Sequence, residues 1–230
     1  MYVEFLGLPG SGKSTLLASL VKRSAQSDFR FRPLNEAAEE QHAKLLNSPG
    51  YVSRKPGRGW LYATLTFAQT YPEVFRTLFE NTIESAWENQ IAIDFLGQFQ
   101  LAKKSRTGSD IVLCDEGFLH RGAVACSKPN LYSDIDTYLQ HIPRCGAVIF
   151  VGLDVATSLE RCKARPKGLP NVYKSLTEEQ ITEKMTALKD MHEICAAQQE
   201  QAGAQVLRID GNRPVSELCE DLFAALTSKA

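Results

Sequence analysis

Glycine, lysine and hydroxyl residues with the spacing of a phosphate site stand near the start of the sequence. Residues 7–15 read Gly-Leu-Pro-Gly-Ser-Gly-Lys-Ser-Thr, which is the pattern G-x-x-x-x-G-K-[ST] of a phosphate-binding loop. Glycines permit backbone conformations in which successive N–H groups turn toward one anion. In such a loop the lysine reaches the β- and γ-phosphates of a nucleoside triphosphate, and the first hydroxyl ligates Mg²⁺. The residues predicted to bind the nucleotide are Gly7, Leu8, Pro9, Gly10, Ser11, Gly12, Lys13, Ser14 and Thr15.

The elements around this loop are those that a triphosphate site requires. An apolar run over residues 2–6 predicts a strand, and a helix predicted from residue 14 to about 24 would direct its free amides and dipole at the anion. A chance glycine-rich turn is the alternative, and this strand–loop–helix order argues against it. Further strands are predicted over residues 29–34, 111–114, 147–153 and 206–209.

Helical segments separate these strands, which predicts a three-layer α/β fold with a mostly parallel five-stranded sheet and helices on both faces. Helices are predicted over residues 60–71, 72–79, 83–105, 156–164, 177–202 and 215–226, with loops over 47–51 and 54–59. The 177–202 helix opens on Thr177-Glu178-Glu179-Gln180, which fits a capping box. No repeat or linker is visible. We therefore expect a single domain over residues 1–230, with a helical insertion at about 45–105 and a lid at about 156–175.

Composition narrows the class of partner. The chain has 230 residues, 43% of them hydrophobic, and a formal net charge of −1, which argues against a large basic surface for a nucleic acid polymer. Its six cysteines are widely spread and form no Cys-x-x-Cys pair, so they are expected to be reduced core residues. The apolar runs are too short to span a bilayer, and no signal peptide is evident. We expect a cytoplasmic protein without a membrane partner, and a homodimer stays open.

Two acids end the strand predicted over residues 111–114. Ligands of open α/β sheets bind at the carboxyl ends of the strands, so Asp115 is expected to face the phosphate loop and to hold Mg²⁺ together with Ser14. Glu116 could orient Asp115, hold a water molecule or take a proton from the acceptor. The alternative is that both acids mark a solvated strand end. Arg121 follows at about one helical turn and could neutralise phosphate charge.

A second pair of basic residues follows the strand predicted over 147–153. Arg161 and Arg165 lie four residues apart, so in a helix both side chains would point the same way and could converge on the transferred phosphoryl group. The segment 166–170, which is rich in proline and glycine, would form a flap that excludes water. The alternative is a solvated basic helix.

Together these parts resemble the nucleoside and nucleotide kinases of the thymidylate kinase-like and adenylate kinase-like branch of phosphate-loop proteins. The resemblance rests on residues 7–15, 115–116, 161–165 and 206–215, of which the phosphate loop alone is sequence-specific. It implies ATP- and Mg²⁺-dependent transfer of the γ-phosphate to a small-molecule acceptor, with a nucleoside or nucleoside monophosphate as the first expectation. It also implies that the backbone of the segment with Gly211, Asn212 and Pro214 lies against the adenine.

The acceptor is less well marked. The family commonly has Asp-Arg where this chain has Asp115-Glu116, so either Glu116 or Glu36, which follows the second strand, is expected to position the acceptor. The candidates for binding it are Glu36, Arg54, Arg58 and Trp60, with Trp60 and Tyr62 able to stack on a ring. A kinase of a sugar, antibiotic or natural product is the main alternative, and a non-catalytic or regulatory ATP-binding protein is the other. A GTPase is disfavoured because residues 151–154 lack the Asn-Lys-x-Asp pattern.

Overall fold

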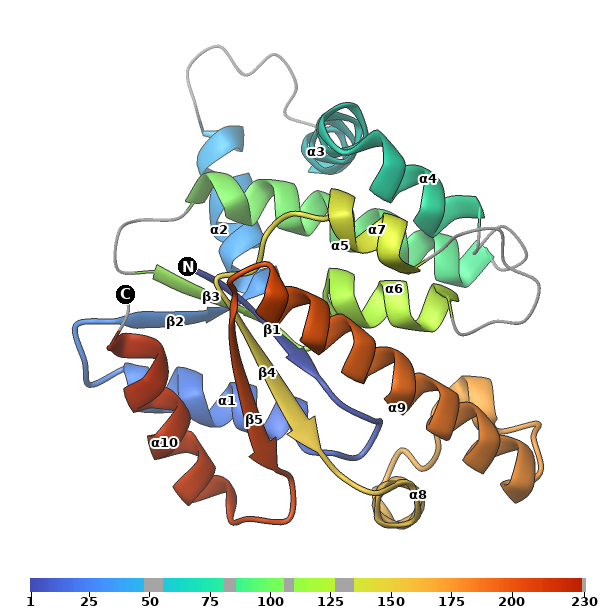
Figure 1. Ribbon diagram of the computed structural model, residues 1–230. Coiled ribbons are helices and arrows are strands. Elements are labelled where there is room, and N and C mark those ends of the chain that lie inside the picture. The colour runs from blue at the N-terminus through green and yellow to red at the C-terminus, as the bar shows by residue number, and fades with distance from the viewer. Residues whose placement is uncertain (48–55, 81–85, 106–109, 127–134, 229–230) are drawn as a thin grey trace.

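The computed structural model describes residues 1–47, 56–80, 86–105, 110–126 and 135–228 (Figure 1). Its centre is one sheet with the strand order β2-β3-β1-β4-β5, and each of the four pairings is parallel. The strands are β1 (Tyr2–Leu6), β2 (Arg30–Pro33), β3 (Asp110–Cys114), β4 (Ala147–Gly152) and β5 (Gln205–Asp210). The predicted α/β class is confirmed, and the sheet predicted to be mostly parallel is wholly parallel.

Helices cover both faces of the sheet (Figure 1). One face carries α1 (Lys13–Ser24) and α10 (Val215–Thr227), which pack on each other. The other face carries α2 (Leu34–Leu46), α3 (Pro56–Thr70), α4 (Pro72–Glu80), α5 (Ala86–Ser105), α6 (Phe118–Cys126), α7 (Ile135–His141) and α9 (Glu178–Gln201). Helix α8 (Val155–Ala164) and the short 3-10 helix η1 (Asn171–Tyr173) lie between β4 and α9 along the chain.

The central strand shows how the two cores are separated. Side chains alternate across a strand, so Val3 and Phe5 join the core beneath α1 and α10, whereas Tyr2 and Leu6 join the core beneath the other helices. Glu4 shares the face of Tyr2 and Leu6 and is fully buried. All five strand arrows in Figure 1 point toward the same edge of the sheet, where the loop after β1 also lies. This edge is the expected place for a ligand.

Several sequence predictions are confirmed in detail, and others are wrong. The capping box of α9 is present, because the Thr177 hydroxyl accepts from Gln180 N–H and the Gln180 side chain accepts from Thr177 N–H. The loop predicted over 54–59 is wrong for residues 56–59, since α3 begins at Pro56, and proline suits the first position of a helix. Helices α2, α6 and α7 were not predicted. Five of the six cysteines are buried, and all six are free.

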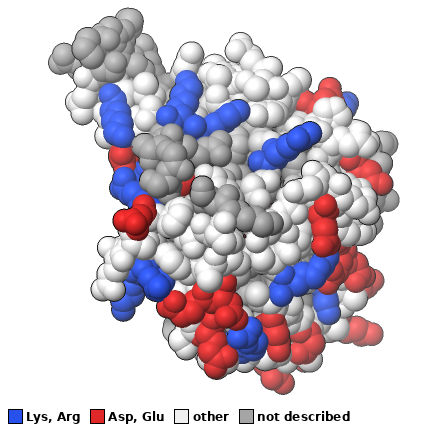
Figure 2. Space-filling view, turned by 60° about the vertical axis from the view of Figure 1, so that its left-hand side comes forward, with Lys and Arg blue, Asp and Glu red and all other residues white. Residues whose placement is uncertain are grey.

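The surface supplies two further observations. On the face seen in Figure 2 the acidic side chains gather mainly toward the lower part, at the level of α1 and α10. Arg23 pairs there with Glu220, and Arg213 pairs with Asp221; such exposed pairs add little stability. Within the described ranges, no helix combines the length and the apolar character needed to cross a bilayer.

Candidate functional site

The segment after β1 has the backbone of an anion-binding loop. Gly10 has φ +86°, and a Cβ on it would lie 2.7 Å from the Ser158 carbonyl oxygen and 3.0 Å from Cys162 Sγ. Gly12 has φ +98° and precedes the first residue of α1. Glycine alone adopts these left-handed conformations without strain. The sequence therefore forms a tight turn whose following helix directs its free N-terminal amides at the space that the loop encloses.

Lys13 is the first residue of α1 and is 8% exposed. Its Nζ donates hydrogen bonds to the carbonyl oxygens of Gly7 at 2.7 Å and Leu8 at 3.0 Å, both within the loop. Burial lowers the pKa of Lys13 from its usual 10.5 to about 8, and the nearby carboxylates of Glu116 and Asp115 oppose that shift. The ammonium is thus held in the loop by weak backbone acceptors, which a phosphate oxygen can replace.

The lowered pKa of Lys13 gives a pH prediction. Below a pH of about 8 the free protein carries the ammonium, and above it the neutral amine predominates. If ATP binds to the charged form, kcat/KM for ATP falls as the pH rises through about 8, whereas kcat changes less because bound phosphate holds the proton. Initial rates from neutral to strongly alkaline pH measure this. Lys13→Arg stays charged in that range, so a residually active arginine variant with the same alkaline decline would assign the pKa elsewhere.

Ser14 and Asp115 meet across the site as the sequence predicts. The Ser14 hydroxyl donates a 2.7 Å hydrogen bond to Asp115 Oδ2, although 101 positions separate the two residues. The register of β1 beside β3 brings them together, since both strands end at the same edge of the sheet. A hydroxyl and a carboxylate are oxygen ligands of the kind that Mg²⁺ prefers.

Two cavities open beside the loop and share part of their walls. The larger has a volume of about 1530 Å³ and lies between the phosphate loop, α6, the segment after α8 and the first half of α9. The smaller has a volume of about 320 Å³ and lies between the ends of β2 and β3, the start of α2, and α5. Ser14, Glu116 and Arg121 line both cavities. A group bound in one cavity can therefore meet a group bound in the other at these three side chains.

The two cavities differ in charge. Among the described residues, the larger is lined by seven cationic side chains and two carboxylates, which suits a polyanion. The cations are Lys13, Arg121, Arg161, Arg165, Lys167, Lys174 and Lys184, and the carboxylates are Glu116 and Glu183. In the smaller cavity the charged residues of the described lining are Asp115, Glu116 and Arg121. Its remaining polar groups include the amides of Asn35 and Gln98.

Arg121 lies where the two cavities meet, and its guanidinium can bind a ligand there. The carbon of that group lies 4.6 Å from the centre of the Phe95 ring, a cation–π contact. Its Nε is buried and has no hydrogen-bond partner among the described residues. An aromatic face holds the guanidinium while leaving its N–H groups for a ligand.

Of the two arginines predicted to converge, Arg161 lies within helix α8 and Arg165 follows its last residue. The helix ends at Ala164, and Arg165 has extended backbone. Arg161 donates to the Gly211 carbonyl oxygen at 2.9 Å and to Asn212 Oδ1 at 3.0 Å. Arg165 donates from Nε to the Gly168 carbonyl oxygen at 2.8 Å. Both still line the larger cavity, but their bonds serve different loops.

Helix α8 is attached to the phosphate loop rather than free of it. The Ser158 hydroxyl donates to the Pro9 carbonyl oxygen, and Cys162 packs against Gly10. The loop after β5 also lies beside the phosphate loop. Gly211 N–H donates to the Gly152 carbonyl oxygen, and a Cβ on Gly211 would lie 3.3 Å from the Ser11 carbonyl oxygen. Gly211, Asn212 and Pro214 thus follow a strand that ends beside the phosphate loop, although none of them lines either cavity within the described chain.

The contacts of Arg161 predict that its removal weakens ATP binding but leaves kcat almost unchanged. Arg161→Ala removes both bonds to Gly211 and Asn212, so the loop expected to meet the adenine loses its support. We expect the KM for ATP to rise about tenfold, equivalent to about 1.4 kcal/mol, with kcat changed by less than about twofold. Steady-state rates at varied ATP measure this, with Lys163→Ala, an exposed neighbour on α8, as control. A fall in kcat at unchanged KM would instead indicate that Arg161 acts on the transferred phosphoryl group, as the sequence analysis predicts.

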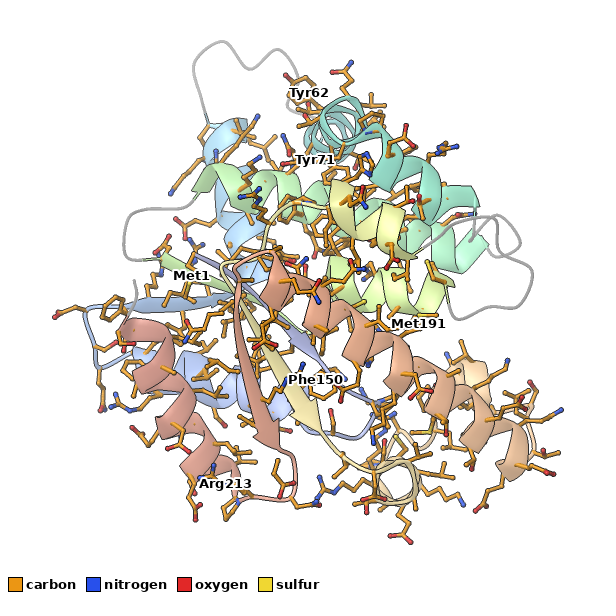
Figure 3. All side chains as sticks on the ribbon, viewed as in Figure 1. Met1, Tyr62, Tyr71, Phe150, Met191 and Arg213 are labelled. Atoms are coloured by element: carbon orange, nitrogen blue, oxygen red, sulfur yellow. The ribbon has the colours of Figure 1, made fainter. Side chains whose placement is uncertain are left out.

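The residues predicted to bind the acceptor are less well supported. Glu36 is exposed in the first turn of α2 and lines neither cavity in the described structure, whereas its neighbour Asn35 does. Trp60 packs its ring 5.3 Å from that of His42 and against Gly97, so it joins α3 to α2 and α5. Tyr62 is 61% exposed and points outward at the far end of the molecule from the phosphate loop (Figure 3). Arg54 lies outside the described residues, as does the side chain of Arg58.

Several cavity residues were missed by the sequence analysis. Phe95 and Gln98 lie three positions apart on α5 and face the smaller cavity, but helical spacing alone does not distinguish that face from the core. His120 lines the larger cavity and contacts His192, with 3.1 Å between Nδ1 and Nε2. Glu4 was read as part of an apolar run, although a carboxyl in the middle of a buried strand is itself a signal.

No family model and no curated protein matches this chain. Among solved structures, the chain is similar to a deoxyadenosine kinase from M. mycoides with bound dATP. The two share 16% sequence identity with a TM-score of 0.47, and the similarity covers 99% of this chain and 100% of the other. What this chain does is therefore inferred from the geometry of its own residues.

Proposed function

We propose that this protein is an ATP- and Mg²⁺-dependent phosphotransferase that moves the γ-phosphate of ATP to a small-molecule acceptor. The observation that carries the proposal is the junction of the two cavities. The cationic cavity at the phosphate loop and the smaller cavity meet at Ser14, Glu116 and Arg121. A donor and an acceptor need such a shared boundary, whereas a site that only binds nucleotide does not.

The donor triphosphate fits the larger cavity. Its phosphates would accept hydrogen bonds from the amides at the start of α1, and Lys13 would exchange its bonds to Gly7 and Leu8 for phosphate oxygens. Ser11 Oγ is buried without a hydrogen-bond partner among the described residues, so the loop retains one unused polar group for the ligand. The adenine would lie toward the Gly211–Pro214 loop, which Arg161 supports.

The residues present also fit a magnesium ion bound with the nucleotide. The Ser14 hydroxyl would ligate it and the Asp115 carboxylate would hold it directly or through water, in place of their present hydrogen bond. When bound, the ion neutralises charge on the β- and γ-phosphates. The described ranges contain no group of three or more His, Cys, Asp or Glu side chains suited to a metal by themselves. The phosphates of ATP would therefore supply the remaining ligands.

Transfer at the junction requires positioning and charge neutralisation more than covalent chemistry. The acceptor oxygen would form a bond to the γ-phosphorus as the bond from that phosphorus to ADP breaks, and its proton would pass to the Glu116 carboxylate. Glu116 is exposed and lines both cavities, so we assign it this role in preference to Glu36. Arg121 and Arg165 would neutralise charge on the transferred oxygens.

The smaller cavity favours an unphosphorylated acceptor with a ring. The described part of its lining contains one cation, Arg121, and two carboxylates, which would repel a second phosphate. Phe95 supplies an apolar part of the wall, and Asn35 and Gln98 supply amides that can both donate and accept. A nucleoside combines a ring with amide-like edges and a free hydroxyl, so we propose a nucleoside in preference to a nucleoside monophosphate.

The wider organisation follows from the same assignment. We propose that residues 1–230 form a single catalytic domain, in which α2 and α5 supply the acceptor side of the site. Because α8 is attached to the phosphate loop through Ser158 and to the loop after β5 through Arg161, the lid would be the segment 165–176 rather than one that begins at residue 156. We propose a cytoplasmic location for the enzyme.

Phosphorus NMR tests the proposal. The protein is incubated with ATP and Mg²⁺ and with separate pools of nucleosides, nucleoside monophosphates, sugars and hydroxylated antibiotics. A new phosphomonoester signal in the nucleoside pool, formed as ADP appears, is the expected result. A new diphosphate in the monophosphate pool would overturn the choice of an unphosphorylated acceptor, and a phosphoester in another pool would change the acceptor class. ADP formed equally slowly in every pool would favour a nucleotide-binding regulator.

A further inference from the structure

Glu4 is a buried carboxyl that the proposed reaction does not use. It lies in the middle of β1 with 0% exposure, in a strand whose five residues are all buried. It lines neither of the two cavities described above. Burial raises the pKa of Glu4, because it disfavours the charged form. A carboxyl is costly in such a place unless hydrogen bonds compensate, so its partners indicate its purpose.

The partners of Glu4 are the first amides of α6. Its Oε1 accepts from Phe118 N–H at 2.9 Å, and its Oε2 accepts from Leu119 N–H at 2.8 Å. These two residues begin α6, where amides have no partner within the helix, and where the helix dipole favours negative charge. The Tyr2 hydroxyl donates a third bond to Oε1 at 2.8 Å. The side chain of one strand thus caps a helix that lies 114 positions away.

Gly117 leaves room for this contact. A Cβ on Gly117 would lie 2.3 to 2.6 Å from the carboxyl atoms of Glu4, which is closer than atoms can approach. The residue immediately after Asp115 and Glu116 is therefore packed directly on the Glu4 carboxyl. This contact fixes the turn that ends β3 as well as the helix that follows it.

The contact of Glu4 with the start of α6 lies between two parts of the proposed site, the phosphate loop and the segment that carries Glu116 and Arg121. Glu4 lies three residues before Gly7, the first residue of the phosphate loop, whereas the capped segment carries Glu116 on one side and Arg121 on the other. We propose that Glu4 is a positioning residue, which sets the distance between the phosphate loop and the pair Glu116 and Arg121. This inference rests on the proposed phosphotransferase activity but assigns Glu4 no contact with a substrate.

Two variants break the contact from opposite sides. Glu4→Gln cannot accept from both amides, since one of its two oxygens becomes an NH₂ donor. Gly117→Ala places a methyl group against the same carboxyl. Because a misplacement of about 1 Å costs as much as about 100-fold in rate, each variant is expected to lower kcat by about 10- to 100-fold, with KM for ATP within about twofold. The double variant should lose no more than the worse single variant, since both break one contact.

Tyr2→Phe is the matched control, because it removes the third donor and leaves both amides bonded to Glu4. Its kcat should match the wild type. Hydrogen exchange supplies a readout independent of turnover, in which the amides of Phe118 and Leu119 exchange faster in Glu4→Gln, whereas those of α10 do not. Unchanged exchange at these amides, or a loss of ATP affinity in proportion to kcat, would overturn the inference. Absence of transfer by the wild type would instead refute the proposed function, and the exchange result would still test the contact.

Discussion

Replacing Lys13 with alanine is expected to lower kcat for phosphoryl transfer by about 1000-fold, the upper range for removal of a donor that stabilises a transition state. Lys13 is the first residue of α1, directly after the loop, and its Nζ is held by two loop carbonyls that phosphate can displace. The fold should persist, because burial disfavours its charge and lowers its pKa to about 8. Its removal therefore takes away no strongly stabilising ion pair.

Transfer rate and melting temperature are measured together for this variant. Lys22→Ala is the matched control, since Lys22 lies on the same helix α1 but is exposed. We expect the control to match the wild type in both measurements. A Lys13→Ala protein that melts normally and still turns over within about tenfold of the wild type would show that the loop amides suffice, and that the lysine has no role at the phosphates.

The second large effect is expected at Asp115. Asp115→Asn keeps the shape and the hydrogen-bond acceptor for Ser14 but removes the negative charge opposite that hydroxyl. We expect kcat to fall by about 100-fold and the Mg²⁺ concentration for half-maximal rate to rise, because carboxylate oxygens bind this hard cation more strongly than amide oxygens do.

Mg²⁺ titrations at saturating ATP measure both quantities. Asp190→Asn removes the same charge from an exposed position on α9 and should change neither. If Asp115→Asn lowers kcat but leaves the Mg²⁺ dependence unaltered, Asp115 acts through Ser14 or through the position of Glu116 rather than through the ion.

The fold could be predicted from sequence largely because its strands are short and parallel, and because β1, β3 and β4 are almost wholly buried. Such strands are continuous apolar runs, and residues 147–152 are an example whose predicted end lies within one residue of the observed end. Helix α6 was missed because its N-terminal stabilisation comes from Glu4, more than a hundred residues away. The helix propensity of residues 118–126 cannot reveal a capping residue so far away in the sequence.

The parts of the candidate site that depend on the order of neighbouring elements along the chain could be predicted from the sequence. The phosphate loop, and the meeting of Ser14 with Asp115, follow from the strand–loop–helix pattern and from parallel pairing. The lining of the smaller cavity, where we propose that the acceptor binds, was not predictable in this way. Gln98 and Phe95 face the smaller cavity because of how α5 is rotated where it packs on α2 and α3, whereas the ring of Trp60, an equally plausible candidate by residue type, packs against its neighbours.

The positions and hydrogen bonds of Arg161 and Arg165 could not be predicted from their spacing either. The interval of four between Arg161 and Arg165 indicates a common face only if the helix continues through both, and α8 ends between them. That spacing also gives no information on the separate bonds of the two side chains, which go to Gly211 and Asn212 from Arg161 and to Gly168 from Arg165.

The central position of β1 has a consequence for the order in which the chain folds during synthesis. Its two neighbours are β3 and β4, so its backbone groups find their last partners only when residues 147–150 have left the ribosome. Helices α2, α3 and α5 pack on one another and can assemble before then, since local contacts form faster than distant ones. The phosphate loop gains its support from Ser158 and Gly211 later still. β1 and the phosphate loop are therefore synthesised before their partners and reach their native structure only after those partners have emerged.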